Sequence, residues 1–168
     1  MAIDKVKIVN FKCFKGTFEI ELNKGLNILV GDNEAGKSTI LEAIHLALTG
    51  LYNGKNINNE LSQYLFNSEV IEEYINSVNG GTPLPPPSVL IEIYFDGSLD
   101  PDFEGNKNTD HRTSAEGLSF EIAYNEKFND EYEKIIDKGG MLSLPIEYYE
   151  TLWTSFSRRV ITVRSIPV

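Results

Sequence analysis

Apolar residues near the start of the chain recur at every second position. Val6 and Ile8 are separated by a lysine, and the apolar residues of 18–22 alternate with glutamates. Alternation with a period of two is typical of a strand that has one buried face and one solvated face. Because the turn residues 15–16 separate the two segments, the pattern predicts a β-hairpin over 6–22.

A short apolar run at 26–30 comes next, and the period changes after it. The run is aliphatic and is of the type found in buried strands. Beyond it, apolar residues recur at the three- and four-residue spacing of a helix until Gly50, at Ile40, Leu41, Ile44 and Leu48. The pattern therefore predicts three strands, then a loop, then a helix.

The stretch 51–88 is polar and rich in asparagine, and one amphipathic helix is predicted within it at 68–78. It ends in the proline-rich residues 80–87, whose composition favours extended polyproline geometry. We interpret 51–88 as a polar insertion or linker. The prolines suit either a stiff surface linker or a docking segment for an SH3-like partner.

The rest of the chain predicts further strands and helices. Residues 89–95 form an apolar run interrupted by one glutamate and predict a strand, and 118–124 predict another. A charged helical pattern covers 125–138, and the aromatic-rich run 141–156 has spacings that suit a helix packed on the sheet. Residues 160–163 predict a last strand.

The residues 31–39 satisfy the phosphate-loop pattern G-x-x-x-x-G-K-[ST]. Backbone N–H groups wrap a triphosphate most closely, and a loop bounded by glycines presents them in one concave arc. Lys37 is expected to place its charge against the β- and γ-phosphates of ATP as a catalytic residue, and Ser38 to ligate Mg²⁺. The predicted nucleotide contacts in this motif are Gly31, Asn33, Glu34, Ala35, Gly36, Lys37, Ser38 and Thr39.

The motif also has a purely structural interpretation, a glycine-rich turn that precedes a core helix. A phosphate loop is expected to follow a strand and to open a helix, and both flanks are predicted here. That helix would direct the positive end of its dipole at the phosphates. We therefore favour the nucleotide site.

Composition narrows the setting of this site. The 168 residues, 41% of them hydrophobic, suffice for one globular domain, and the net charge of −10 argues against a broad nucleic-acid-binding face. The dense basic group Arg158, Arg159 and Arg164 is interpreted as solvated strand residues. Cys13 is the only cysteine and is interpreted as a core residue, so we expect no internal disulfide and a cytoplasmic protein. No segment approaches the ~18 apolar residues of a membrane span, so no membrane is expected as a partner.

Residues 8–16 and 25–44 together resemble a known group of proteins. They read I-x-N-F-[KR]-x-F and then G-x-N-x-x-x-G-x-N-x-A-G-K-S-T-x-L-E-A. This combination is similar to the N-terminal ATPase segment of RecF/SMC-like ABC ATPases, and within them most similar to OLD-family ATP-dependent endonucleases. The resemblance implies an α/β fold, a P-loop NTPase (ABC-ATPase-like) lobe with a mixed sheet and an antiparallel β portion. It also implies that Lys12, the basic residue of the first pattern, approaches the nucleotide.

Other elements of such ATPases are missing from the sequence. It contains no LSGG-type signature motif, and the run 93–96 ends in Asp96 without the second acid of a Walker B strand. We therefore interpret residues 1–168 as an incomplete N-terminal ATPase lobe of a longer chain. His45 and His111 lack partners at metal-ligand spacing and are interpreted as packing or surface residues.

The resemblance implies ATP binding by this lobe and ATP hydrolysis in a full-length dimer, as part of a DNA-processing protein such as an OLD-like nuclease or a DNA-repair enzyme. Self-association would run through the ATPase lobe, and DNA would bind regions outside it. The alternative is a nucleotide-gated regulatory or structural module of SMC or RecF type, in which ATP binding drives association. An acidic Toprim-like region after residue 168 would favour the nuclease, and long heptad repeats would favour the alternative.

Overall fold

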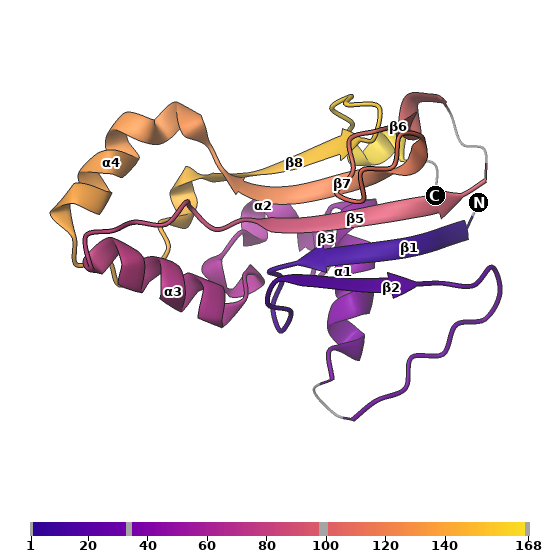
Figure 1. Cartoon of the computed structure of the whole chain (residues 1–168), viewed down its shortest axis with the longest axis horizontal. Coiled ribbons are helices and arrows are strands. Elements are labelled where there is room, and N and C mark those ends of the chain that lie inside the picture. Colours follow the sequence, from indigo (N-terminus) through magenta and orange to yellow (C-terminus); the bar gives the residue numbers. More distant parts are fainter. Residues whose placement is uncertain (1, 33–34, 98–100, 167–168) are drawn as a thin grey trace.

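The computed structural model describes residues 2–32, 35–97 and 101–166, and an antiparallel sheet runs through the middle of them (Figure 1). Its six strands follow the order β2-β1-β5-β7-β6, and β8 also pairs with β7. All strand pairings in the described residues are antiparallel. The strands of this sheet are β1 (Ala2–Val9), β2 (Thr17–Glu21), β5 (Val89–Asp96), β6 (Glu104–Gly105), β7 (Ala115–Tyr124) and β8 (Tyr149–Ser155).

Helices cover one face of the sheet and extend past one of its ends. Helix α1 packs its apolar residues into the same core as β1 and β5, and α3 and α4 lie together at the left end in Figure 1. The helices are α1 (Lys37–Thr49), α2 (Ile57–Glu60), α3 (Ser68–Asn79) and α4 (Asn129–Lys138). A small hairpin, β3 (Leu51–Tyr52) and β4 (Lys55–Asn56), follows α1, and the short 3₁₀ turns are η1 (Gln63–Leu65), η2 (Pro101–Phe103), η3 (Glu126–Phe128), η4 (Ile146–Tyr148) and η5 (Val163–Ser165).

The period-two pattern divides the side chains of β1 between the two faces of the sheet. Val6 and Ile8 pair with Ile93 and Ile91 of β5, and all four side chains are fully buried in the core. Burial of one such aliphatic side chain stabilises the fold by about 1.5–3 kcal/mol. Lys5 and Lys7, which alternate with Val6 and Ile8 along β1, therefore point to the opposite face.

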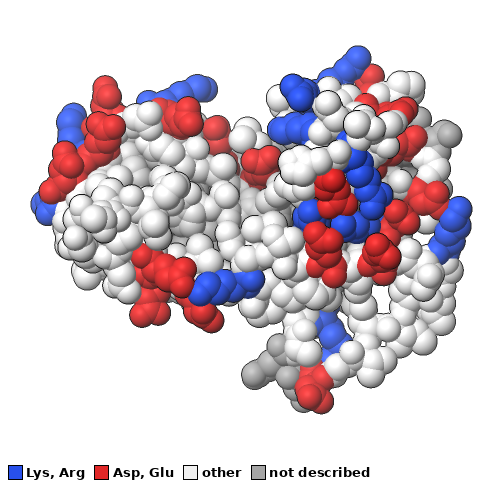
Figure 2. All heavy atoms as spheres, viewed as in Figure 1, with Lys and Arg blue, Asp and Glu red and all other residues white. Residues whose placement is uncertain are grey.

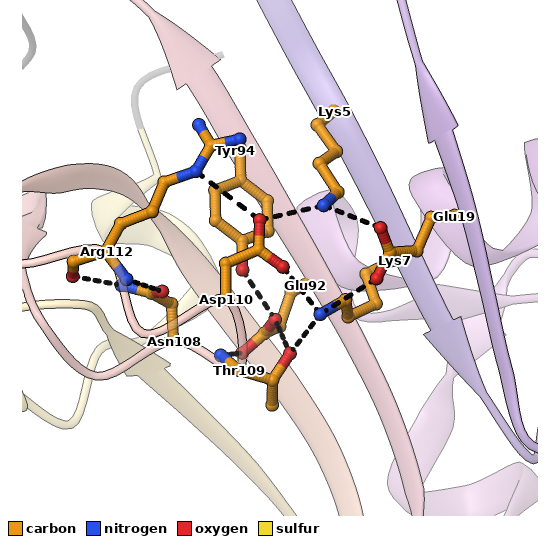
Figure 3. Close-up of polar contacts among 9 residues, drawn as sticks. All are labelled: Lys5, Lys7, Glu19, Glu92, Tyr94, Asn108, Thr109, Asp110 and Arg112. Carbon is orange, nitrogen blue, oxygen red and sulfur yellow. Dashed lines mark hydrogen bonds and ion pairs between the residues drawn. The ribbon is translucent and has the colours of Figure 1, made fainter.

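On that opposite face, Lys5 and Lys7 hold the loop that leads into β7 (Figure 3). Their ammonium groups lie 2.8 and 2.6 Å from the Asp110 carboxylate. Glu19 on β2 lies 2.7 and 3.0 Å from the same two ammonium groups, and Arg112 lies 3.4 Å from Asp110. The two lysines are almost fully buried, so each charge has opposite charges in place of water.

Glu92, the only charged residue in the middle of β5, belongs to the same network. It is 2% exposed and accepts hydrogen bonds from the backbone N–H and hydroxyl of Thr109 at 2.9 and 2.6 Å. The hydroxyl of Tyr94 donates to it at 2.8 Å. The glutamate that interrupts the apolar pattern of β5 is thus an anchor for the covering loop, which we name the clasp loop and define as 106–114.

Specific polar contacts cap α3 and attach it to α4 and to the segment after α4. The side chain of Asn67 caps α3 by accepting from its first backbone N–H groups at 3.1 and 3.3 Å. The hydroxyls of Tyr74 on α3 and Tyr132 on α4 lie 2.8 Å apart in a buried setting. Asn79 exchanges two hydrogen bonds with the backbone of Met141, at 2.9 and 2.8 Å. The stretch 51–88, predicted as a polar insertion or linker, is therefore structured and packed over much of its length.

Most predicted elements are present with small shifts of their bounds. The N-terminal hairpin is β1 and β2. The predicted helices that end at Gly50 or cover 68–78 and 125–138 correspond to α1, α3 and η3 with α4. The strands predicted at 89–95 and 118–124 are β5 and β7. The prediction of an α/β lobe with an antiparallel β portion is confirmed.

The strand predicted at 26–30 is not formed. The side chains of Leu26, Ile28 and Val30 are 84%, 73% and 89% exposed, and the segment pairs with no strand in the described part of the chain. A buried strand of this type needs neighbouring strands and covered faces. Without this segment, the sheet of the described residues is antiparallel throughout.

Two predictions near the end of the chain are wrong. No helix spans 141–156: its second half, Tyr149–Ser155, is β8, because the tyrosine, tryptophan and threonines there pair along β7 and fit a pleated surface. Trp153 packs on Phe120 with ring centroids 4.6 Å apart and donates its indole N–H to the backbone of α1. At 160–163, Val160 makes an isolated bridge, and no strand is present in the described residues.

The prediction that Cys13 is a core residue is also wrong, because its side chain is exposed. The turn between β1 and β2 takes left-handed conformations at Asn10 and Lys12, with φ of 55° and 49°. These conformations direct Phe11 into the core and leave the thiol at the surface beside α1. Sequence neighbours such as Phe11 and Phe14 therefore do not report the burial of the residue between them.

Charges of both signs are interspersed on the face seen in Figure 2, which carries no continuous basic surface. The prediction that Arg158 and Arg159 are solvated strand residues is wrong. Arg158 lies in a turn with φ of 70°, and Arg159 forms an ion pair with Asp102. In the part of the chain that the structure describes, none of the helices has the length and apolar character to span a bilayer.

Candidate functional site

The start of α1 is built around Gly36. This buried glycine has φ of 83°, and its carbonyl accepts the first helical hydrogen bond from Ile40 at 3.0 Å. A Cβ at Gly36 would lie 2.7 Å from the ring of Phe14 and 3.1 Å from the sulfur of Cys13. Glycine is needed here both for the left-handed backbone and for the close approach of the β1–β2 turn.

The first turn of α1 offers a place for an anion. It has no side-chain cap and no acidic residue, so no carboxylate of this turn occupies its positive end. Backbone N–H groups at such an end bind phosphate well. Ser38 is exposed at this end, with its hydroxyl in the first turn.

Lys37 folds back over the loop that precedes the helix. Its ammonium donates hydrogen bonds to the carbonyls of Gly31 and Asp32, the second at 2.6 Å. The N–H of Ala35 donates to the Asp32 carbonyl at 3.2 Å, which curls the loop. A Cβ at Gly31 would lie 3.2 Å from the Cβ of Ala35, so the two ends of the curl are close. The ammonium therefore lies where it can exchange carbonyl oxygens for phosphate oxygens.

The predicted site residues that the structure describes gather at this helix start. Six of them come together: Gly31, Ala35, Gly36, Lys37, Ser38 and Thr39. Asn33 and Glu34 lie outside the described residues. The arrangement suits the phosphates of a nucleoside triphosphate, because a curled backbone, a helix N-terminus and an ammonium converge at one place.

Lys12 lies close to this site and has partners that the sequence did not reveal. Its ammonium contacts the carboxylate of Glu42 on α1 and lies 5.0 Å from the ring centre of Tyr52. Glu42 is the glutamate of the L-E-A end of the quoted pattern, so the sequence pattern could have indicated that it lies near the site. Nothing in the pattern indicated Tyr52, which the β3–β4 hairpin brings in.

Asp96, the residue that resembles the end of a Walker B strand, lies far from the phosphate loop. It pairs with Ala2 at the start of β1, whereas the loop packs on the turn after the end of β1. An eight-residue strand separates these points by roughly 25 Å. Asp96 forms an ion pair with Lys24 at 2.6 Å.

His45 and His111 are both exposed, and the described residues contain no cluster of three metal-binding side chains.

Comparison with known proteins identifies relatives of this chain. Residues 5–148 match the model of the family AAA_23, described as an AAA domain. The chain is 56% identical over 46 residues to the "DNA double-strand break repair Rad50 ATPase" of Methanopyrus kandleri, covering 27% of this chain and 5% of that protein. It is 27% identical over 133 residues to the "DNA replication and repair protein RecF" of Vibrio cholerae, covering 76% of this chain and 35% of that protein.

A solved structure also matches, reported as "Structural biochemistry of ATP-driven dimerization and DNA stimulated activation of SMC ATPases". The match has a TM-score of 0.46 and 17% identity, and covers 98% of this chain and 74% of that one. The chain thus spans only a small part of the curated Rad50 and RecF relatives named above, between 5% and 35% of their length.

Proposed function

Since the chain belongs to the AAA_23 family of AAA domains, a P-loop ATPase lobe similar to the N-terminal region of Rad50 and RecF proteins, we propose that residues 31–39 with Lys12 bind Mg-ATP. The observation that carries the proposal is the start of α1. There a glycine-bounded curl, an uncapped helix end and the Lys37 ammonium converge. Calorimetric titration with ATP in the presence of Mg²⁺ tests it, and the absence of binding at millimolar ATP would contradict it.

The roles of the residues follow from their chemistry. The N–H groups of the loop and of the first turn of α1 would hold the phosphates, and Lys37 would neutralise the β- and γ-oxygens. Ser38 would supply the protein oxygen for Mg²⁺, which when bound neutralises phosphate charge. Thr39 would donate its hydroxyl to the same phosphates.

We propose further that the lobe serves a DNA-repair ATPase in which ATP binding brings two such lobes together. The support is the similarity to proteins named as Rad50 repair ATPases and RecF replication and repair proteins. The net charge of −10 argues against a broad basic face, so DNA would bind regions outside this segment. The OLD-type nuclease stays a separate hypothesis, since the relatives named above are Rad50 and RecF proteins.

The chain by itself is expected to be a very poor ATPase. Its sequence lacks a signature motif and the Asp-Glu end of a Walker B strand, and Asp96 on β5 pairs with Ala2, at the end of β1 away from the phosphate loop. In P-loop ATPases the attacking water needs a residue that orients it. Phosphate release measured with saturating Mg-ATP should therefore stay far below about 1 per second, a low-normal enzyme turnover. Turnover near that rate would show that an acid within this chain suffices.

The chain is also expected to self-associate through 26–30. Leu26, Ile28 and Val30 all face solvent, and their backbone pairs with no strand in the described residues. Apolar side chains beside unpaired backbone groups promote edge-to-edge pairing. Sedimentation over a concentration series should show association that Ile28→Lys reduces. Leu142→Lys, at a position 93% exposed elsewhere on the surface, is the matched control and should leave it unchanged. A wild-type monomer at high concentration would contradict the prediction.

A further inference from the structure

Lys12 and Glu42 form an ion pair next to the candidate nucleotide site. The ammonium contacts the carboxylate directly, and the two side chains are 24% and 39% exposed. Burial alone would lower the pKa of Lys12, but Glu42 and Tyr52 outweigh this effect and raise the pKa. The lysine is therefore a full positive charge that is already neutralised by a partner.

The pair lies one helical turn from the phosphate-binding end of α1. Glu42 follows Thr39 by three residues, a spacing that places two side chains on neighbouring positions of one helix face. Cys13, the residue after Lys12, has its sulfur 3.6 Å from the hydroxyl of Thr39. One helical turn is about 5.4 Å long, which the four-carbon stem of lysine can span. The ammonium can therefore contact either Glu42 or a phosphate at the start of α1.

The backbone of Lys12 is fixed, so this exchange concerns its side chain alone. Its N–H donates to the carbonyl of Leu65 at 3.0 Å, and its carbonyl accepts from the side chain of Asn67 at 2.8 Å. The left-handed φ of 49° belongs to the same tight turn. The turn thus keeps the base of the side chain beside α1, so that an exchange of partners needs only rotation about the side-chain bonds of Lys12.

We propose that Glu42 competes with bound phosphates for Lys12, so that the ion pair is a self-inhibiting contact that ATP must replace. The inference rests on the proposed function, because it takes the start of α1 as the phosphate site. A carboxylate one turn from a polyanion opposes binding by its own charge and, in addition, occupies a second cation, Lys12, that lies beside the site. Glu42 acts through Lys12 and is therefore a positioning residue.

Calorimetric titration with Mg-ATP of the wild-type chain and of matched variants tests this competition. Glu42→Gln should bind ATP about two- to fivefold more tightly than wild type, the range expected for release of a partly exposed ion pair. The gain should vanish in the double variant with Lys12→Gln. Glu73, on α3, forms an exposed ion pair with Lys15. Glu73→Gln removes the same charge there and should leave the ATP affinity unchanged. Glu42→Ala removes the same charge and leaves no amide that could hydrogen-bond to Lys12, so it should also bind ATP more tightly than wild type.

Each outcome decides the question. Unchanged or weaker binding in both Glu42 variants would overturn the competition, and so would a gain that persists fully with Lys12→Gln, since that would be a general charge effect. Equal melting temperatures of wild type and Glu42→Gln would separate the affinity change from a change in folding. A wild-type chain that binds no ATP would overturn the proposed function together with this inference, whereas binding without the Glu42 effect overturns the inference alone.

Discussion

Replacing Lys37 with alanine is expected to weaken Mg-ATP binding about tenfold or more. A hydrogen bond to a charged group contributes roughly 1.5–3 kcal/mol, and 1.4 kcal/mol corresponds to a factor of about ten in affinity. The ammonium already lies at the mouth of the loop, on the carbonyls of Gly31 and Asp32. The ammonium needs little reorganisation to contact phosphate, so its removal should cost the whole binding free energy of this contact. Calorimetric titration of both proteins measures the difference.

The control for this comparison is Lys15→Ala. Lys15 is also a lysine near the N-terminal turn, but it pairs with Glu69 and Glu73 on α3 and is 43% exposed. Its loss removes the same charge from the chain without touching the loop. Alanine at position 37 is a good helix former, so α1 should persist and the melting temperature should change little. Equal ATP affinity of wild type and Lys37→Ala would remove Lys37 from the site.

Replacing Asp110 with alanine is expected to destabilise the fold by about 3–5 kcal/mol, the effect of removing one partner from a buried ion pair. Lys5 and Lys7 are 8% and 7% exposed, and both depend on this carboxylate (Figure 3). Glu19 alone would be left to neutralise two buried ammonium groups. For a chain of this size the melting temperature should fall by on the order of 10 °C, which calorimetry or circular dichroism would detect.

An exposed ion pair provides the control for Asp110. Glu73→Ala breaks a contact whose carboxylate side chain is 58% exposed, and such pairs contribute about 0–1 kcal/mol. If Asp110→Ala melted within a few degrees of Glu73→Ala, the clasp loop would not be held by its charges.

The same network makes the stability depend on pH in acid. Burial alone would raise the pKa of Asp110, but hydrogen bonds from Lys5 and Lys7 outweigh it and lower the pKa from 3.8 to about 2. A lowered pKa in the folded state means that the stabilisation is complete above the unfolded value and is lost as the pH falls through the folded one. The clasp loop should therefore loosen between about pH 4 and pH 2.

The sequence was sufficient for the parts of the molecule that local rules govern. Gly36 followed by lysine and an amphipathic run predicts a helix with a curled loop before it, and Lys5 and Lys7, which alternate with Val6 and Ile8, are expected to face away from the core. The helix start and the two-faced strand were both predicted from neighbouring residues, although the lysine face is covered by the clasp loop and is not solvated. The interrupting glutamate in β5 was visible as an anomaly, but its explanation was not.

The failures concern residues whose state depends on distant partners. Asp110 meets Lys5 and Lys7 from more than a hundred positions away, and no periodicity reports such a contact. The segment 26–30 has the composition of a buried strand but no strand beside it in the described residues. The aromatic run at 141–156 fits helical spacing equally well, and only its pairing with β7 selects the strand.

The order of the strands also determines when the chain can fold as it is synthesised. β1 lies between its hairpin partner β2 and β5, so Val9 pairs with Leu90 and Ala2 with Asp96. On the ribosome the N-terminal hairpin is complete early, but its other edge has no partner until β5 has emerged with the whole of α1 and α3 before it. Pairings this distant in sequence close late and favour slow folding. During that interval the edge of β1 that will pair with β5 is unpaired, and such an edge favours pairing with other chains.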